Sequence, residues 1–280
     1  MAHTPVMLSE AISFLEVQDG KSYLDLTAGF GGHASEILKK IPNGQLYLID
    51  RDDSALNHLK SMFSGKENVH IMKMNFSNID FSIKFDGILA DLGVSSFQFD
   101  SVDRGFSYRF DAPLDLRMDR SEKNLLEELL ANDRQYISDV IRKNSDEYQA
   151  DEIASEMKKR HDAGRLKTTF DLKQAIIDGK RNRDVKQGLK RVFMALRMYV
   201  NSESESLHAM IEKVPRHLNE NGRFVILTYH SIEDRMVKEF FKKNSEMRSV
   251  TKKVVRPSYF EVMENKRARS AKMRIYEKTA

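Results

Sequence analysis

A short apolar strand pattern that runs into three closely spaced glycines constrains this chain more than any other feature. Leu24 and Leu26 belong to the strand pattern, and Gly29, Gly31 and Gly32 follow before a helical apolar pattern begins. Glycine lets the backbone approach a ligand closely because no Cβ stands in the way. The helix beyond the turn offers unpaired N–H groups and a partial positive charge. This unit predicts a nucleotide or cofactor site in an α/β sheet.

Two aspartates near this turn bear on which cofactor it would hold. The spacing Gly29-x-Gly31-x-x-Ala34 fits the dinucleotide-binding pattern, and Asp50 follows about 20 residues later, where a ribose-binding acid belongs. Asp25 lies inside the strand, where a negative charge would repel a pyrophosphate. The amino group and sulfonium of S-adenosylmethionine are positively charged, so a carboxylate at this position would attract them. The residues favour S-adenosylmethionine, while an NAD-linked Rossmann oxidoreductase stays open as an alternative.

Buried strand patterns recur along the chain and place acids at strand ends. We expect six strands, at 22–27, 45–50, 69–72, 85–93, 223–231 and 273–277, the last on or near a sheet edge. Helical patterns separate the first three of these strands, which predicts a parallel sheet with helices on its faces. Asp25, Asp50 and Asp91 would then meet at the carboxyl edge, where ligands of such sheets bind.

The middle of the chain lacks the strand pattern. Residues 94–120 show no clear periodicity but many aromatic residues, which predicts a loop over the cofactor and the target rather than a disordered linker. Helical periodicity follows at 125–131, 133–143, 146–162 and 169–178. We therefore predict an α/β sheet domain formed by residues 1–104 and 192–280, interrupted by an all-helical insertion at 105–191.

The charge distribution is uneven although the net charge is only +4. Residues 1–150 hold 16 Lys and Arg against 24 Asp and Glu, whereas residues 151–280 hold 30 against 18. A basic second half favours contact with a polyanion such as a nucleic acid. The chain has no cysteine, scattered histidines and no long apolar run. We expect no disulfide, no metal site, no membrane span and a cytoplasmic location.

Motifs along nearly the whole chain resemble one family, the bacterial MraW (RsmH) methyltransferases. The matching stretches include Asp25-x-Thr27-x-Gly29-x-Gly31-Gly32-His33, Asp50-Arg51-Asp52, Asp86-Gly87-Ile88-Leu89-x-Asp91-Leu92-Gly93, Arg104-Gly105-Phe106-Ser107, Pro113-Leu114-Asp115-x-Arg117-Met118-Asp119, Tyr229-His230-Ser231-Ile232-Glu233-Asp234 and Asn265-x-Arg267-x-Arg269-Ser270-Ala271. The resemblance implies a Rossmann-like methyltransferase sheet with an inserted helical domain. It also implies methyl transfer from S-adenosylmethionine to N4 of a cytidine in 16S ribosomal RNA of the small subunit.

The resemblance further implies which residues form the cofactor site. They are Gly31, Gly32, His33, Asp50, Phe76, Asp91 and Gln98, and the charge argument adds Asp25. We expect His33 to offer its backbone N–H to the cofactor rather than to act as a base. Asp91 is the first catalytic candidate because it is the carboxylate best placed to touch cofactor or amine. His230 is the second, although a hydrogen-bonded histidine at a strand end explains it equally well.

A cytidine in structured RNA has to be swung out to reach such a pocket, so the RNA needs basic and aromatic contacts. The candidates are Arg104, Phe106, Asp115, Arg117, Lys158, Lys159, Arg181, Arg267 and Arg269. A core position for Phe106 and a structural ion pair between Asp115 and Arg117 remain open interpretations. The sequence does not specify the oligomeric state.

The chain departs from the family pattern in three places. Gly188-Leu189-Lys190-Arg191 stands in place of a His-Pro-Ala-Thr run, Asp146-Glu147-Tyr148 in place of Gly-Glu-Glu, and Tyr229-His230-Ser231-Ile232-Glu233-Asp234 in place of Phe-His-Ser-Leu-Glu-Asp. The first two lie in or next to the insertion and bear on RNA contact rather than on the cofactor site. A methyltransferase for another RNA, a protein or a small molecule and a catalytically silent RNA-binding protein are the further alternatives.

Overall fold

The computed structural model describes residues 5–93, 105–121, 123–181 and 184–279, and they form two compact units. The first, here called the sheet unit, comprises Met1–Gly93 and Glu205–Ala280. The second, the helical unit, comprises Val94–Ser204. The predicted sequence boundary at 191/192 falls inside a continuous helix of the helical unit, α9 (Val185–Val200). Among the described residues, none of the helices combines the length and apolar character that a membrane crossing needs.

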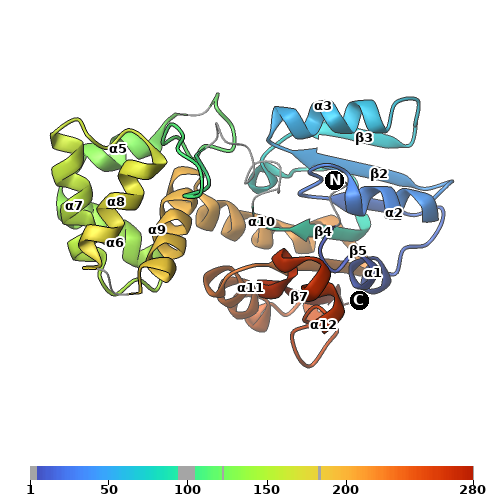
Figure 1. The fold of residues 1–280 in the computed structure, drawn as a ribbon. Coiled ribbons are helices and arrows are strands. Elements are labelled where there is room, and N and C mark those ends of the chain that lie inside the picture. The colour runs from blue at the N-terminus through green and yellow to red at the C-terminus, as the bar shows by residue number, and fades with distance from the viewer. Residues whose placement is uncertain (1–4, 94–104, 122, 182–183, 280) are drawn as a thin grey trace. The chain divides into compact units, whose positions relative to one another are not determined.

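The sheet unit is built on seven strands in the order β3-β2-β1-β4-β5-β7-β6 (Figure 1). Their bounds are β1 Ser22–Asp25, β2 Gln45–Asp50, β3 Val69–Lys73, β4 Phe85–Asp91, β5 Leu218–Thr228, β6 Met247–Ser249 and β7 Lys272–Lys278. The five strands β3, β2, β1, β4 and β5 each pair in parallel with their neighbours, as the sequence predicts. Strand β7 pairs antiparallel with β5 and β6. The last predicted strand is thus one strand from the edge, because the short β6, which the sequence patterns did not indicate, covers it.

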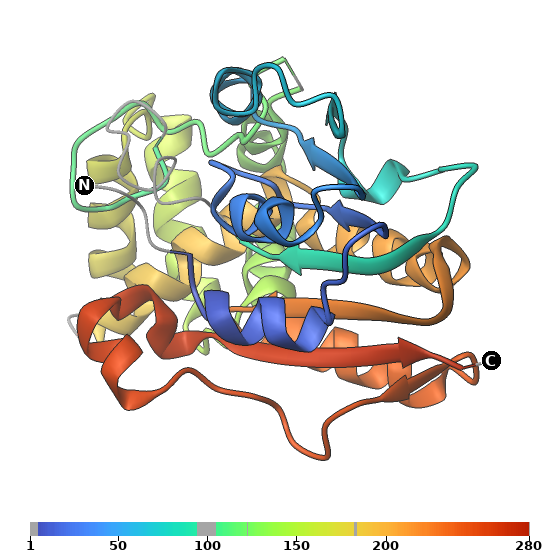
Figure 2. The same cartoon turned by 90° about the vertical axis from the view of Figure 1, so that its right-hand side faces the viewer.

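Alternating side chains of the strands form an apolar layer on each face of the sheet. Tyr23 and Leu89 point into the layer that contains α1 (Leu8–Leu15), α2 (Gly32–Lys40) and α3 (Asp53–Met62). Leu24 and Ile88 point into the opposite layer, with α11 (Ser231–Lys243) and the part of α10 (Glu203–His217) from Glu205 onward. Figure 2 shows these helices on the two sides of the strands. Burial on both faces explains why the strands are apolar runs rather than alternating patterns.

The helical unit packs five described helices around one apolar core. They are α5 Leu125–Ala131, α6 Arg134–Asn144, α7 Ala150–Asp162, α8 Thr169–Gly179 and α9 Val185–Val200. Helix α6 packs against α7 and α9, and α7 packs against α8. The helix bounds predicted within the insertion agree within a few residues except at α7, which begins at Ala150 rather than at residue 146. Side-chain caps account for several starts: Asp133, for example, accepts from the Tyr136 N–H at 2.8 Å.

Candidate active site

Three aspartates end neighbouring parallel strands of the sheet unit. Asp25 ends β1, Asp50 ends β2 and Asp91 ends β4. Burial raises the pKa of Asp25 to about 7, helped by the negative charges of Asp91 and Asp50. Burial also raises the pKa of Asp50 and of Asp91. The carboxyl edge therefore carries a group of acids whose charges are poorly compensated by the protein, as a site for a cationic ligand requires.

The glycine turn lies directly beside these acids, and added side chains at Gly31 and Gly32 would meet neighbouring residues closely. The Gly29 N–H donates to Asp50 Oδ2 at 2.8 Å, which ties the turn to the end of β2. Gly31 has φ +76°, and a Cβ at this position would lie 2.9 Å from Met62 Sδ and 3.1 Å from Leu59 Cδ2. Gly31 precedes the first turn of α2, whose N–H groups are unpaired at that end. The predicted glycine turn between β1 and α2 is thus present, and the positive φ of Gly31 favours glycine there, while its contact with a cofactor stays a prediction.

The sequence-based expectation that His33 offers its backbone N–H to the cofactor stays a prediction, and the structure shows where its side chain lies. Its imidazole is buried, with Nε2 3.2 Å from the Val6 carbonyl oxygen and Nδ1 3.9 Å from Asp91 Oδ2. Since a carbonyl only accepts, Nε2 carries the proton of that hydrogen bond, and Nδ1 faces the carboxylate. Gly32 allows Pro5, the neighbour of Val6, to pack against the turn, because a Cβ at Gly32 would lie 2.2 Å from Pro5 Cγ.

Asp91 is held from three sides. Its backbone N–H donates to Thr27 Oγ1 at 2.6 Å, and the Tyr229 hydroxyl donates to Asp91 Oδ1 at 2.6 Å. His33 faces the other carboxylate oxygen. Burial raises the pKa of Asp91, while His33 and the Tyr229 hydrogen bond act to lower it. The carboxylate is therefore held in one orientation, and its pKa lies closer to neutral pH than that of an exposed aspartate. Both properties suit a proton acceptor.

Tyr229 and Thr27 were not among the predicted site residues. Burial and the charge of Asp91 raise the pKa of Tyr229, so this hydroxyl remains a hydrogen-bond donor. Both residues belong to motifs that the sequence analysis noted, and Tyr229 marks a departure from the family pattern. Their position next to Asp91 depends on the pairing of β4 with β1 and β5, which sequence spacing alone does not specify.

His230, the second catalytic candidate, is the N-cap residue that directly precedes helix α11. Its Nδ1 accepts from the Glu233 backbone N–H at 3.4 Å, and Nε2 lies 3.0 Å from Glu233 Oε1. Glu233 Oε2 in turn accepts from the Tyr229 N–H at 3.0 Å. These contacts give His230 a structural role at the helix start, and a catalytic role remains a prediction.

Of two other predicted cofactor residues, Phe76 and Gln98, the structure describes only Phe76. Phe76 begins the short helix η1 (Phe76–Asn78) after β3 and packs partly buried against the apolar layer of the sheet unit. The strand end before it is tied to β2, because the Met74 N–H donates to the Asp50 carbonyl at 3.0 Å. Gln98 lies outside the described residues.

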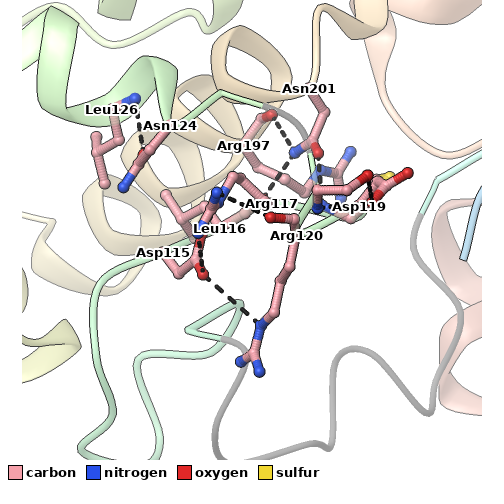
Figure 3. Close-up of polar contacts among 11 residues, drawn as sticks. Asp115, Leu116, Arg117, Asp119, Arg120, Asn124, Leu126, Arg197 and Asn201 are labelled. Atoms are coloured by element: carbon pink, nitrogen blue, oxygen red, sulfur yellow. Dashed lines mark hydrogen bonds and ion pairs between the residues drawn. The ribbon is translucent and has the colours of Figure 1, made fainter. Parts of the chain in front are cut away.

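Asp115 and Arg117, predicted RNA contacts, bind each other within the helical unit (Figure 3). Arg117 Nη2 donates to Asp115 Oδ2 at 3.1 Å, and Arg120 Nε lies 3.7 Å from the same oxygen. Asn201 donates to the Leu116 carbonyl at 2.8 Å and accepts from the Met118 N–H at 2.7 Å. The structural ion pair that the sequence left open is present, and the loop around it is held in place by α9.

The other predicted RNA contacts are scattered over both units. Phe106 is 4% exposed and belongs to the core of the helical unit, so its ring is a core element as the sequence allowed. Lys158 is partly buried, with Nζ 3.0 Å from Asp162 Oδ1. Lys159, Arg181, Arg267 and Arg269 are exposed, and Arg104 lies outside the described residues.

The residues at the carboxyl edge fit S-adenosylmethionine. The buried acids Asp25, Asp50 and Asp91 suit its cationic groups, and the glycine turn brings the start of α2 beside them. Carboxylates can also accept from ribose hydroxyls, which is the role expected of Asp50 at the end of β2. An anionic pyrophosphate would meet the same three acids unfavourably.

Comparison with known proteins gives a consistent result. A family model described as the MraW methylase family matches residues 1–279. The chain is 37% identical over 303 residues to "Ribosomal RNA small subunit methyltransferase H" of Caldicellulosiruptor saccharolyticus, covering 99% of each protein. It is 41% identical over 291 residues to "Ribosomal RNA small subunit methyltransferase H 2" of Acholeplasma laidlawii, covering 98% of this chain and 85% of the relative. The chain therefore belongs to the MraW methylase family and is an S-adenosylmethionine-dependent methyltransferase.

Proposed function

We propose that this chain methylates the N4 amine of a cytidine in 16S ribosomal RNA of the small subunit. The observation that supports it most is similarity over the full length: relatives named small subunit rRNA methyltransferase H align with 98–100% of the chain at 36–41% identity. The basic second half of the sequence supports a nucleic-acid substrate. A cytoplasmic location and the target cytidine belong to this proposal.

The acids and the glycine turn of the sheet unit account for binding of the methyl donor. When bound, S-adenosylmethionine supplies an electrophilic methyl group on its sulfonium. Asp25 attracts the positive charge, Asp50 accepts hydrogen bonds, and Gly31 lets the ligand approach the start of α2. The predicted contacts of His33, Phe76 and Gln98 with the donor remain predictions.

Asp91 accounts for the acceptor side of the reaction. The N4 amine of cytosine is a weak nucleophile because its lone pair is delocalised into the ring. It would gain a bond to the methyl carbon while the bond between that carbon and the sulfonium sulfur breaks, which leaves S-adenosylhomocysteine as a neutral thioether, and the amine would lose one proton. Asp91, oriented by Tyr229 and facing His33, is the carboxylate suited to accept that proton, since its raised pKa makes it a better base than an exposed aspartate.

The helical unit is the proposed RNA-recognition part. Lys159 and Arg181 present exposed positive charge there, and Lys158 lies on the same helix as Lys159. In the sheet unit, Arg267 and Arg269 lie exposed on η3 (Lys266–Ser270). Contacts of this kind bind phosphates without reading the sequence and make the affinity dependent on salt.

The test is methylation of small ribosomal subunits isolated from cells that lack this protein. With methyl-labelled S-adenosylmethionine, we expect label in 16S ribosomal RNA and N4-methylcytidine by mass spectrometry of the nucleosides. Asp91→Asn keeps the shape of the side chain and should reduce the rate by a factor of about 10²–10⁴. Label in protein, in a small molecule or in another nucleoside would contradict the proposed substrate.

The family match rules out the NAD-linked oxidoreductase that the glycine spacing left open. A thermal-shift comparison checks this directly: S-adenosylhomocysteine should raise the melting temperature, and NAD should not. A protein that binds RNA but transfers no methyl group to any substrate would instead favour the catalytically silent alternative.

A further inference from the structure

One turn of helix in the sheet unit turns its apolar side chains outward. Helix α12 (Tyr259–Glu264) exposes Tyr259, Phe260 and Met263, at 73%, 79% and 63% of their accessible surface. The rings of Tyr259 and Phe260 lie 6.0 Å apart at 76°. We call these three side chains the α12 face. Exposed large apolar side chains gathered on one element indicate an interaction surface rather than chance exposure.

The segment that carries this face is firmly attached to the sheet unit. Val262 packs against the core on the inner side of α12, and Ala268 and Ala271 of the following turn are fully buried. Glu261 Oε1 accepts from the Met7 N–H at 2.6 Å, and Val255 forms an antiparallel bridge with Met273. Tyr259 and Phe260 thus project from an ordered base, and their exposure does not result from loose packing.

The surroundings of the α12 face are strongly basic. Residues 252–272 contain seven Lys and Arg against two Glu. Glu261 is turned inward to Met7, whereas Lys252, Lys253, Arg256, Lys266, Arg267 and Arg269 are exposed. Exposed aromatic rings surrounded by positive charge match the way proteins hold single-stranded nucleic acid, with bases stacked on the rings and phosphates on the cations.

The segment that carries the α12 face is attached near the carboxyl ends of the strands, where the candidate active site lies. Helix η3 leads into β7, whose Lys272 pairs with Thr228 at the carboxyl end of β5. Glu261 is hydrogen-bonded to Met7, and the neighbouring residue Val6 accepts from His33, which faces Asp91. A single-stranded RNA bound on the α12 face would therefore lie near the carboxyl edge that carries Asp91.

We propose that the α12 face is a stacking platform for single-stranded RNA next to the target nucleotide. Tyr259 and Phe260 stack on bases of the strand, and the exposed cations around them contact its phosphates. This inference rests on the proposed RNA substrate and adds to it the single-stranded form of the bound segment. It assigns a role to aromatic residues that the motif and charge patterns did not single out.

The test measures binding of the full-length chain to a fluorescent, unstructured RNA of about 12 nucleotides, a length within the range that such surfaces hold. The variant Tyr259→Leu/Phe260→Leu keeps apolar surface but removes both rings, and we expect about tenfold or greater loss of affinity. Tyr259→Phe, which keeps the ring, should bind as the wild type does. Ile83→Ala, at another exposed apolar side chain of the sheet unit, is the matched control and should leave binding unchanged.

The salt dependence separates stacking from phosphate contacts. Arg269→Ala should lower the slope of log affinity against log salt by about 0.7, whereas the double leucine variant should weaken binding at every salt concentration with the slope unchanged. Stabilisation by S-adenosylhomocysteine, equal in all variants, shows that each is folded.

An RNA affinity that is equal in the wild type and the double leucine variant overturns the inference and leaves the α12 face to a protein partner. Wild-type protein that binds no RNA at all counts instead against the proposed function. The two failures are therefore distinguishable.

Discussion

Two carboxylates of this chain are buried to a similar degree but differ in how their charge is compensated. Asp25 in the sheet unit is 1% exposed, and the Glu147 side chain in the helical unit is 0% exposed. Glu147 lies 2.8 Å from the buried Lys180 Nζ and 3.6 Å from Arg191 Nη1. Among the described residues, Asp25 has no ion-pair partner, and the charges that act on its pKa are those of the acids Asp91 and Asp50.

The pKa values of these two groups move in opposite directions for this reason. Burial acts to raise the pKa of Glu147, but the Lys180 hydrogen bond, the Gln149 N–H and the nearby cations hold it below its usual range. Burial raises the pKa of Asp25 to about 7. Glu147 is thus part of a completed structural ion pair, whereas the raised pKa of Asp25 is consistent with the proposed role of this carboxylate in binding a cationic ligand.

The largest effect should come from breaking the completed pair. Lys180→Met leaves Glu147 buried with only the partly exposed Arg191 nearby, and we expect a loss of about 3–5 kcal/mol of folding free energy. Urea unfolding followed by circular dichroism measures this loss. The double variant Glu147→Leu/Lys180→Met removes both charges and should recover most of the stability. A single variant as stable as the wild type would mean that the pair is not structural.

Removing the charge of Asp25 should weaken ligand binding without lowering folding stability. Asp25→Asn takes away the attraction for a cationic ligand, and we expect the affinity for S-adenosylmethionine to fall by about 1.5–3 kcal/mol. Folding stability should stay the same or rise, because an uncompensated buried charge is lost. Isothermal titration calorimetry measures the affinity. Asp86→Asn is the control, since Asp86 accepts from the Ser22 N–H at the other end of β1; equal losses in both variants would contradict a ligand role for Asp25.

The raised pKa of Asp25 also predicts how the folding stability of the ligand-free protein depends on pH. Between the usual value near 3.8 and about 7, the folded state binds a proton that the unfolded state does not. Stability therefore falls as the pH rises through this range, by at most about 1.4 kcal/mol per pH unit from Asp25. Asp50 and Asp91 act in the same direction, because burial raises their pKa values too.

Binding of a cationic ligand should show the reverse dependence, because it requires ionised Asp25. Affinity for S-adenosylmethionine should rise up to about tenfold per pH unit below pH 7 and then level off. Calorimetry between pH 5.5 and 8 measures this, and Asp25→Asn should flatten the curve. A flat curve in the wild type would show that Asp25 does not gain or lose its proton on binding.

The sequence predicted the site best where the chemistry depends on neighbouring residues in one strand and turn. The acids Asp25, Asp50 and Asp91 were identified because they lie at or near the ends of apolar strand patterns, and the glycine turn because its spacing is local. The strands β1 to β4 were placed within a few residues for the same reason. Short elements such as β6 and α12 bury too few side chains to leave a periodic pattern.

What the sequence could not decide depends on contacts between distant segments. The ring of His33 faces Asp91 because Pro5 and Val6 pack over the turn. The ion pair of Asp115 with Arg117 and the core position of Phe106 were each one of two open interpretations, because residue type alone does not show the tertiary partner. The Tyr229 contact with Asp91 likewise arises only from strand pairing.

The smallest effect is expected from the hydroxyl that supports Asp91, and it refines the comparison between compensated and uncompensated acids. Tyr229→Phe removes the hydrogen bond to Asp91 Oδ1, which stabilises the ionised carboxylate. The pKa of Asp91 should then rise further, corresponding to about 0.5–1.5 kcal/mol. If Asp91 accepts the amine proton, the acidic limb of the pH–rate profile moves to higher pH by roughly 0.4–1 unit, while the rate at high pH changes little.

The measurement is the methyl-transfer rate between pH 5.5 and 9 for wild type, Tyr229→Phe and a matched control. Tyr23→Phe is that control, because it removes a buried hydroxyl of β1 that lies near Glu16 and Gln18 instead of Asp91. A uniform loss of rate at every pH would indicate that the Tyr229 hydroxyl only holds the structure. A limb that shifts in Tyr229→Phe and stays in Tyr23→Phe would show that Asp91 is only partly compensated by the protein, in contrast to both Asp25 and Glu147.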